Sequence, residues 1–117
     1  MKRTVIVGVF CLCVSGSAHA DLLGTDFKDK CGSTDPNLQF MDKAFCAGYT
    51  GGVIDFMRDL GNAESPRRGP FCDPAGARAE QYQAVIDKYL ADHPEKLNLR
   101  ASDLIFTALS TAFPCSK

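Results

Sequence analysis

Histidine is scarce in this chain of 117 residues, and of the two present only His93 lies beyond the first twenty positions. A zinc site needs several histidine or cysteine ligands at short spacings, so we expect no metal and no other cofactor. Also missing are a C-x-x-C pair after residue 20, a G-x-S-x-G elbow and a glycine-rich phosphate loop. These absences predict a binding protein with no catalytic residues, not an enzyme.

The sequence also has no excess of basic over acidic residues. Thirteen lysine and arginine residues face fourteen acidic ones, and two of the thirteen, Lys2 and Arg3, lie in the first twenty residues, so residues 21–117 carry a net charge of about −3. Nucleic-acid binding needs a basic surface, and so does attraction to an anionic membrane. We therefore expect no nucleic acid and no membrane as partner, and a protein partner fits the composition best.

The first twenty residues have the layout of an export signal. Two basic residues precede an apolar run over residues 5–14, and Ala18-His19-Ala20 forms an A-x-A cleavage pattern. The run is shorter than the roughly 20 apolar residues needed to span a bilayer, and no other stretch approaches that length. The sequence predicts a signal peptide over residues 1–20 and one exported domain over residues 21–117.

Apolar residues recur at steps of three and four along residues 21–117, and no convincing strand pattern competes with them. Gly61-Asn62 is expected to stop the longest helix. Asp73-Pro74 should open a second helix that His93-Pro94 closes, and a third should run from Asn98 or Leu99 to Pro114. With a short helix over residues 22–30, the predicted fold is all-α, a small disulfide-stabilised bundle of three main helices plus a short N-terminal helix. The expected core face of the longest helix comprises Leu38, Met41, Phe45, Tyr49, Val53, Phe56 and Leu60.

Four cysteines remain beyond the leader, and an even number in an exported protein indicates disulfides. Four cysteines allow three pairings. If the main helices alternate in direction, Cys72 and Cys115 share one end of the bundle, and Cys46 lies roughly 20 Å away at about 1.5 Å per residue. Cys31 is then the better partner for Cys46. We favour Cys31–Cys46 and Cys72–Cys115, which by loop entropy add about 3 and about 4 kcal/mol to the free energy of unfolding as upper limits.

Two further features favour binding. Ala44, Gly48 and Gly51 form a stripe of small residues on the longest helix, although each glycine costs roughly 1 kcal/mol relative to alanine. Such a stripe allows close approach, either by another helix of the same bundle or by a second subunit. The other feature is the loop over residues 62–71, where prolines flank Arg67 and Arg68 and lower the entropy cost of binding. A plain solvated loop remains the simpler interpretation.

The segment Phe45-Cys46-Ala47-Gly48-Tyr49-Thr50-Gly51-Gly52-Val53 resembles the C-x-G-Y-x-x-G core of the Rap/Tai immunity proteins. Phe71-Cys72-Asp73-Pro74, His93-Pro94-Glu95 and the stretch from Ala108 to Cys115 are similar to that family in the same order. The resemblance implies a periplasmic, disulfide-stabilised helical protein, commonly a homodimer, made by bacteria that use type VI secretion. Its characterised members bind and plug peptidoglycan amidase effectors injected by sister cells.

The resemblance also implies that helix connections contact the amidase. In this sequence they carry either Arg67 and Arg68, or His93, Glu95 and Lys96, and the choice between the two connections stays open. The matching motifs are mostly cysteines, glycines and core positions, so they describe the fold more than the partner. One alternative is a periplasmic acid-stress chaperone whose fourteen acidic residues are protonated at low pH. Another is an enzyme that depends on His93.

Overall fold

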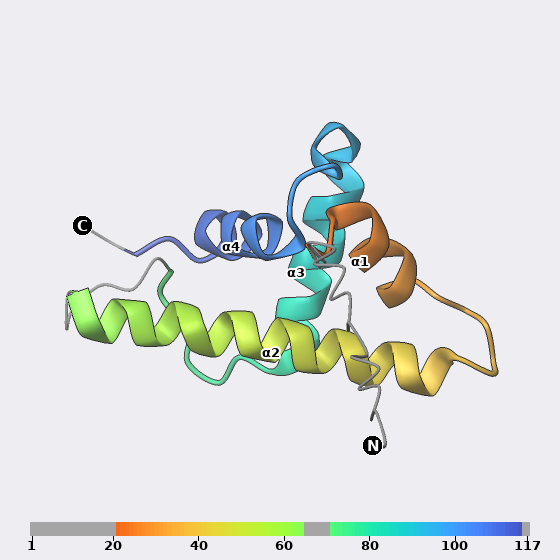
Figure 1. Cartoon of the computed structure of the whole chain (residues 1–117). Coiled ribbons are helices and arrows are strands. Elements are labelled where there is room, and N and C mark those ends of the chain that lie inside the picture. The colour runs from red at the N-terminus through yellow and green to blue at the C-terminus, as the bar shows by residue number, and fades with distance from the viewer. Residues whose placement is uncertain (1–20, 65–70, 116–117) are drawn as a thin grey trace, which may run out of the picture.

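The computed structural model describes residues 21–64 and 71–115, with side chains described outside residues 61–64 (Figure 1). Within these ranges the chain is helical, and its only extended pairing is an isolated bridge between Leu23 and Arg100. The prediction of an all-α, disulfide-stabilised bundle with three longer helices and a short N-terminal one is confirmed. The elements are α1 (Gly24–Cys31), α2 (Gln39–Glu64), α3 (Ala79–Asp92), the 3-10 turn η1 (Pro94–Lys96) and α4 (Ala101–Ala112).

Helix α2 is the longest element, and the other helices pack on one side of it. In Figure 1, α1 lies over its earlier half and α4 over its later half, and both are in contact with it. Helix α3 runs across this arrangement and packs mainly against α4. The apolar side chains of all four helices therefore meet in one core between them.

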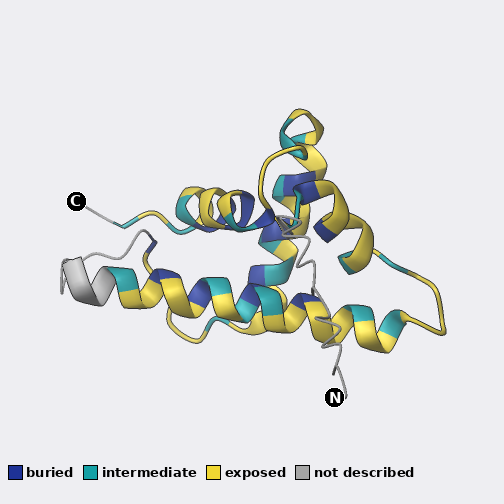
Figure 2. Cartoon of the chain, in the orientation of Figure 1, coloured by how far each residue is buried: buried dark blue, intermediate teal, exposed yellow. Residues whose placement is uncertain are grey.

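The core draws its largest buried side chains from every α-helix (Figure 2). Burying each such side chain stabilises the fold by about 1.5–3 kcal/mol. On α3, Tyr82, Ile86 and Leu90 face the core as predicted, whereas Ala79 is exposed. The fully buried set is Phe27, Met57, Ile86, Leu90, Leu104, Ile105 and Leu109.

Two predicted helix ends are wrong. Helix α2 continues through Gly61-Asn62 to Glu64, because a glycine inside a helix costs only about 1 kcal/mol and does not by itself end one. Helix α3 begins at Ala79 and not at Asp73-Pro74. The backbone of Gly76 has φ +76°, which no α-helix contains, and the Asp73 carboxylate is bonded to other side chains and caps no helix.

The expected core face of α2 is also partly wrong. Met41 and Phe56 are 70% and 62% exposed, and Tyr49 and Val53 are half-buried. The residues that face the core are Cys46, Thr50, Ile54 and Met57. Helix α2 thus has a buried apolar face and an adjoining one that the described residues leave largely exposed, and the predicted pattern runs from the edge of the core, at Tyr49 and Val53, onto that exposed face.

Candidate binding surfaces

Two disulfides fix the helix ends. Cys31, the last residue of α1, is bonded to Cys46 in α2, with 5.7 Å between their Cα atoms. Cys72 is bonded to Cys115, with 4.9 Å between Cα atoms, and the Cys72 N–H also donates to the Phe113 carbonyl oxygen at 2.9 Å. These are the pairs favoured from the sequence. They attach α1 to α2, and the segment before α3 to the residues after α4.

The connection between α3 and α4, residues 93–100, brings three candidate contact residues together. The His93 ring packs against the Tyr89 ring with 4.4 Å between centroids, and its Nδ1 lies 3.1 Å from Glu95 Oε1. Lys96 Nζ donates to the Tyr89 hydroxyl at 3.2 Å and lies 5.6 Å from the centre of the same ring. Tyr89 therefore holds the side chains of His93 and Lys96 in place at this end of the molecule.

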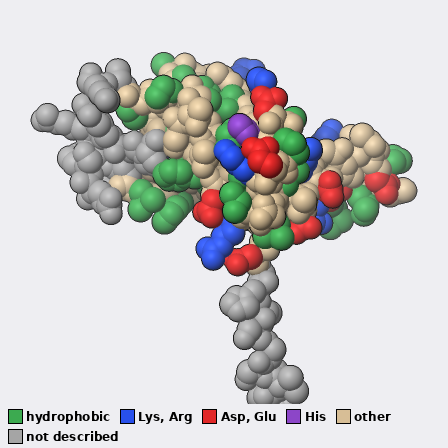
Figure 3. Space-filling view, turned by 90° about the horizontal axis from the view of Figure 1, so that it is seen from above, with side chains coloured by type: hydrophobic (Ala, Val, Ile, Leu, Met, Phe, Trp, Pro, Cys, Tyr) green, Lys and Arg blue, Asp and Glu red, His purple; other side chains and the backbone are tan. Residues whose placement is uncertain are grey.

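Two carboxylates beside this connection are held in their ionised form. A hydrogen bond from its own backbone, and then one from His93, lower the pKa of Glu95. The hydrogen bond from Lys88 Nζ, at 2.7 Å, lowers the pKa of Asp92. In Figure 3, acidic and basic side chains mix over the face seen from above. A partner that binds here would need both kinds of charge.

The other two candidate contacts, Arg67 and Arg68, lie outside the described residues. His93, Glu95 and Lys96 are thus the predicted contact residues that can be placed. They come from one short stretch around η1. His93 and Lys96 both contact Tyr89, and Glu95 contacts His93.

The small-residue stripe of α2 divides between two surfaces. Gly48 and its neighbour Gly52 line a groove of about 460 Å³ between α2 and α4, together with Phe56 and Phe106. Gly51 faces the other way, into a cleft of about 750 Å³ between α2 and α3. Ala44 is exposed.

Within residues 21–64 and 71–115, no side chain or backbone packs closely against these glycines. A Cβ atom added at Gly48, Gly51 or Gly52 would meet no atom of the described residues within 4 Å. Both predicted reasons for the stripe, a neighbouring helix or a second subunit, stay predictions. We call the apolar surface formed by Met41, Phe45, Gly48, Gly52 and Phe56 the α2 outer face.

A direct polar contact spans the cleft between α2 and α3. Thr50 Oγ1, from a side chain that is nearly fully buried, donates to Gln83 Oε1 at 3.2 Å. Gln83 in turn donates to Asp87 at 2.8 Å. Across residues 21–64 and 71–115, no group of three His, Cys, Asp or Glu side chains is arranged to hold a metal ion.

A family model of the Rap1a immunity proteins matches residues 23–115. The chain belongs to this family. The match confirms the resemblance read from the cysteine and glycine motifs, and it covers all four α-helices and both disulfides. No curated protein and no solved structure matches the chain. None of the described helices is long and apolar enough to cross a membrane.

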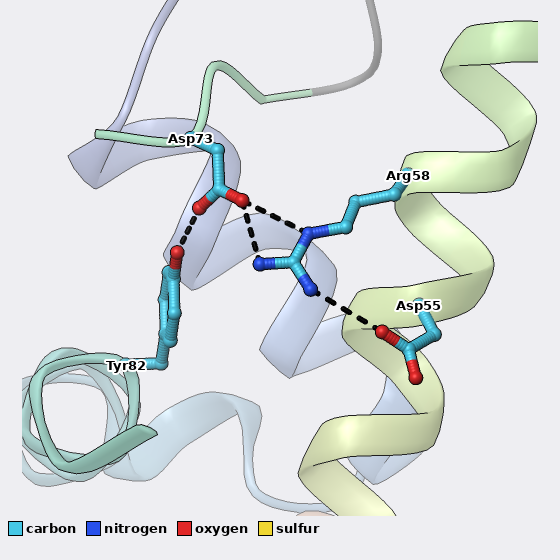
Figure 4. A network of polar contacts seen from close by, with 4 residues as sticks. All are labelled: Asp55, Arg58, Asp73 and Tyr82. Carbon is cyan, nitrogen blue, oxygen red and sulfur yellow. Dashed lines mark hydrogen bonds and ion pairs between the residues drawn. The ribbon is translucent and has the colours of Figure 1, made fainter. Parts of the chain in front are cut away.

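A polar network that joins α2 to α3 through Asp73 left no sign in the sequence (Figure 4). Arg58 of α2 donates to Asp73 Oδ2 from Nε at 2.9 Å and from Nη2 at 2.6 Å, and to Asp55 Oδ1 at 3.2 Å. Tyr82 of α3 donates to the second oxygen of Asp73. Asp73 looked like a helix cap, and nothing in the sequence marked Arg58, 15 residues away, as its partner.

Gly52 was also missed, although a signal for it exists. It follows Gly48 by four residues, so the two glycines lie on the same side of α2, one turn apart. Phe106 of α4, which lines the same groove, could be placed there only once the packing of α4 on α2 was known.

Proposed function

We propose that this protein is a periplasmic immunity protein that binds and blocks a peptidoglycan amidase delivered by type VI secretion, and so protects the cell wall of the producer. The observation that carries the proposal is the match to the Rap1a immunity proteins over residues 23–115. In this proposal residues 1–20 are the signal peptide, residues 21–117 are the exported domain, and the protein acts as an inhibitor with no catalysis of its own.

We further propose that the α3–α4 connection enters the amidase cleft through His93, Glu95 and Lys96, with Arg67 and Arg68 as additional contacts. The packing of His93 and Lys96 on Tyr89 supports this choice. A side chain that is already ordered loses little conformational entropy on binding, so more of the contact energy remains as affinity.

The direct test mixes the purified exported domain with an amidase encoded by a neighbouring gene and follows the release of cleaved peptidoglycan fragments. We expect loss of hydrolysis at equimolar protein and a stable complex on a sizing column. Full amidase activity against a molar excess would contradict the proposal.

The contact surface is tested with a charge-matched pair of double variants. Glu95→Gln with Lys96→Ala should weaken amidase binding about thirtyfold, the effect of losing about 2 kcal/mol at an interface hot spot. Lys28→Ala with Asp29→Asn removes the same two charges from the exposed side of α1 and should leave binding unchanged. Equal affinities of the two variants would exclude the α3–α4 connection as the contact.

We also propose that the α2 outer face joins two copies of the protein. Phe45 and Phe56 lie on either side of Gly48 and Gly52 and are 39% and 62% exposed. In a two-fold dimer the same patch meets itself. Two α2 helices that cross antiparallel at the glycines bring Phe45 of each copy towards Phe56 of the other, and the groove beside Phe106 has room for an aromatic ring.

A further inference from the structure

Residues 22–25 run alongside the end of the α3–α4 connection and are bonded to it through the backbone. Gly24 N–H donates to the Leu99 carbonyl at 2.9 Å, and Thr25 N–H donates to the Leu97 carbonyl at 3.0 Å. In the opposite direction, Ala101 N–H donates to the Leu22 carbonyl at 2.8 Å. We call these three hydrogen bonds, around the Leu23–Arg100 bridge, the N-terminal clamp.

The clamp is tight because Gly24 passes close to its neighbours. A Cβ atom at this position would collide with Leu104 Cδ1 and would lie 3.0 Å from the Leu97 carbonyl oxygen. Leu104 is itself almost fully buried, so it has little space to move away. Glycine is the residue that lets the two backbone segments approach to hydrogen-bonding distance here.

The rest of the connection is held by its own turns. Lys96 N–H donates to the His93 carbonyl at 3.1 Å, and Leu99 N–H donates to the Lys96 carbonyl at 2.9 Å. These bonds set the shape of residues 93–99, and the contacts of His93 and Lys96 with Tyr89 join the start of the connection to α3. The clamp fixes the other end of the connection, because its acceptor Leu97 directly follows Lys96 and its acceptor Leu99 comes two residues later.

We propose that the N-terminal clamp is a positioning element that holds His93, Glu95 and Lys96 in their binding arrangement, an inference that rests on the proposed function. The clamp residues do not touch the partner in this proposal. When only a fraction of the molecules has the binding shape, the apparent dissociation constant rises by the inverse of that fraction. Loosening the clamp should therefore weaken binding while the helical core stays intact.

Thr25→Pro removes one clamp bond with little other change. Thr25 is the second residue of α1, where a helix leaves the backbone N–H unused, and proline is well tolerated in a first turn. The residue before it is a glycine, which is less restricted by a following proline than other residues are. The ring takes away the N–H that donates to Leu97 and occupies its space.

Two variants serve as controls. Thr25→Ala removes the same side chain but keeps the N–H. Asp26→Ala changes the next residue of the first turn, where no clamp bond is lost and no proline ring restricts Thr25. Hydrogen exchange of the Gly24 and Ala101 amides reports on the clamp, and exchange of the buried Leu109 amide reports on the core.

For Thr25→Pro we expect at least tenfold faster exchange at Gly24 and Ala101, unchanged exchange at Leu109, and at least a tenfold higher dissociation constant for the amidase. Both controls should stay within twofold of the unaltered protein in all three measurements. Faster exchange with unchanged affinity would overturn the positioning role, and so would unchanged exchange at Gly24 and Ala101. If the unaltered protein does not bind the amidase, the proposed function fails, while the exchange data still show whether residues 22–25 hold the connection.

Discussion

Arg58 holds one carboxylate oxygen of Asp73 between two N–H groups, at 2.9 Å from Nε and 2.6 Å from Nη2 (Figure 4). The pair joins α2 to the segment that leads into α3. Tyr82 bonds the other oxygen of the same carboxylate, so Asp73 connects both helices. Because Asp73 follows Cys72 directly, this contact and the Cys72–Cys115 disulfide hold the same part of the chain.

Arg58→Gln should lower the free energy of unfolding by about 1 kcal/mol or less, because both partners are more than a third exposed and water screens the ion pair. Urea denaturation measures the change. Arg78→Gln, at an exposed arginine before α3, is the control and should have no measurable effect. In a double-mutant cycle with Asp73→Asn, additive effects would show that the two residues are not coupled.

Replacing each disulfide by a pair of serines should destabilise the protein, and by different amounts. The Cys72–Cys115 pair spans 43 residues and the Cys31–Cys46 pair 15, so loop entropy gives losses of about 4 and about 3 kcal/mol respectively. Denaturation under oxidising conditions ranks the two variants. A larger loss for the shorter loop would show that strain or denatured-state structure outweighs loop entropy.

Gly48→Ala should separate the stability of the monomer from its association. The added methyl group meets no atom of the described residues within 4 Å, and alanine favours the helix, so the free energy of unfolding of dilute monomer should rise by about 1 kcal/mol. The same methyl group should keep two α2 helices apart and weaken the proposed dimer. Sedimentation at several concentrations measures the association.

Phe56→Ser tests the proposed dimer interface by removing an aromatic side chain of the α2 outer face. It should weaken association at least tenfold, as expected for an aromatic anchor, with little loss of monomer stability because the side chain is 62% exposed. Leu99→Ser, at a residue that is 47% exposed and lies off the α2 outer face, is the matched control. Equal association of the two variants would place the interface elsewhere.

The side chain of Glu95 should titrate below its ordinary pKa of 4.5. Since the folded state depresses this pKa, the contact between His93 and Glu95 is complete above about pH 4.5 and is lost as the pH falls through the lower, folded value. An NMR titration of the Glu95 carboxyl checks this. His93→Ala should move the pKa only part of the way towards 4.5, because the hydrogen bond from the Glu95 backbone remains. Titration at 4.5 or above in the unaltered protein would contradict the expectation.

Much of this fold follows from local sequence signals. Helical periodicity located four helices, because each buries an apolar face such as Tyr82, Ile86 and Leu90 of α3. The assumption that the main helices alternate in direction was enough to favour the cysteine pairs that the structure contains, although α3 runs across the other helices. The family was identified from residues around the cysteines and glycines, and the family match agrees with it.

Other features depend on contacts between distant residues and left no local signal. The start of α3 was misplaced because Asp73 bonds Arg58 and Tyr82, where a cap was expected. The apolar face of α2 was identified correctly as a pattern but assigned to the wrong environment, since periodicity cannot tell a core from an interface. The N-terminal clamp consists of backbone hydrogen bonds between residues 22–25 and residues 97–101. A pattern of apolar and polar side chains does not predict such bonds.

Both disulfides join neighbouring cysteines of residues 21–117, the first with the second and the third with the fourth. The two closed loops follow one another along the chain without overlapping. If the chain is exported as proposed, N-terminus first into an oxidising compartment, Cys31 and Cys46 can form the first correct bond before Cys72 arrives. Pairing in order of appearance gives the native connectivity, and the protein should mature without a disulfide isomerase to reshuffle it.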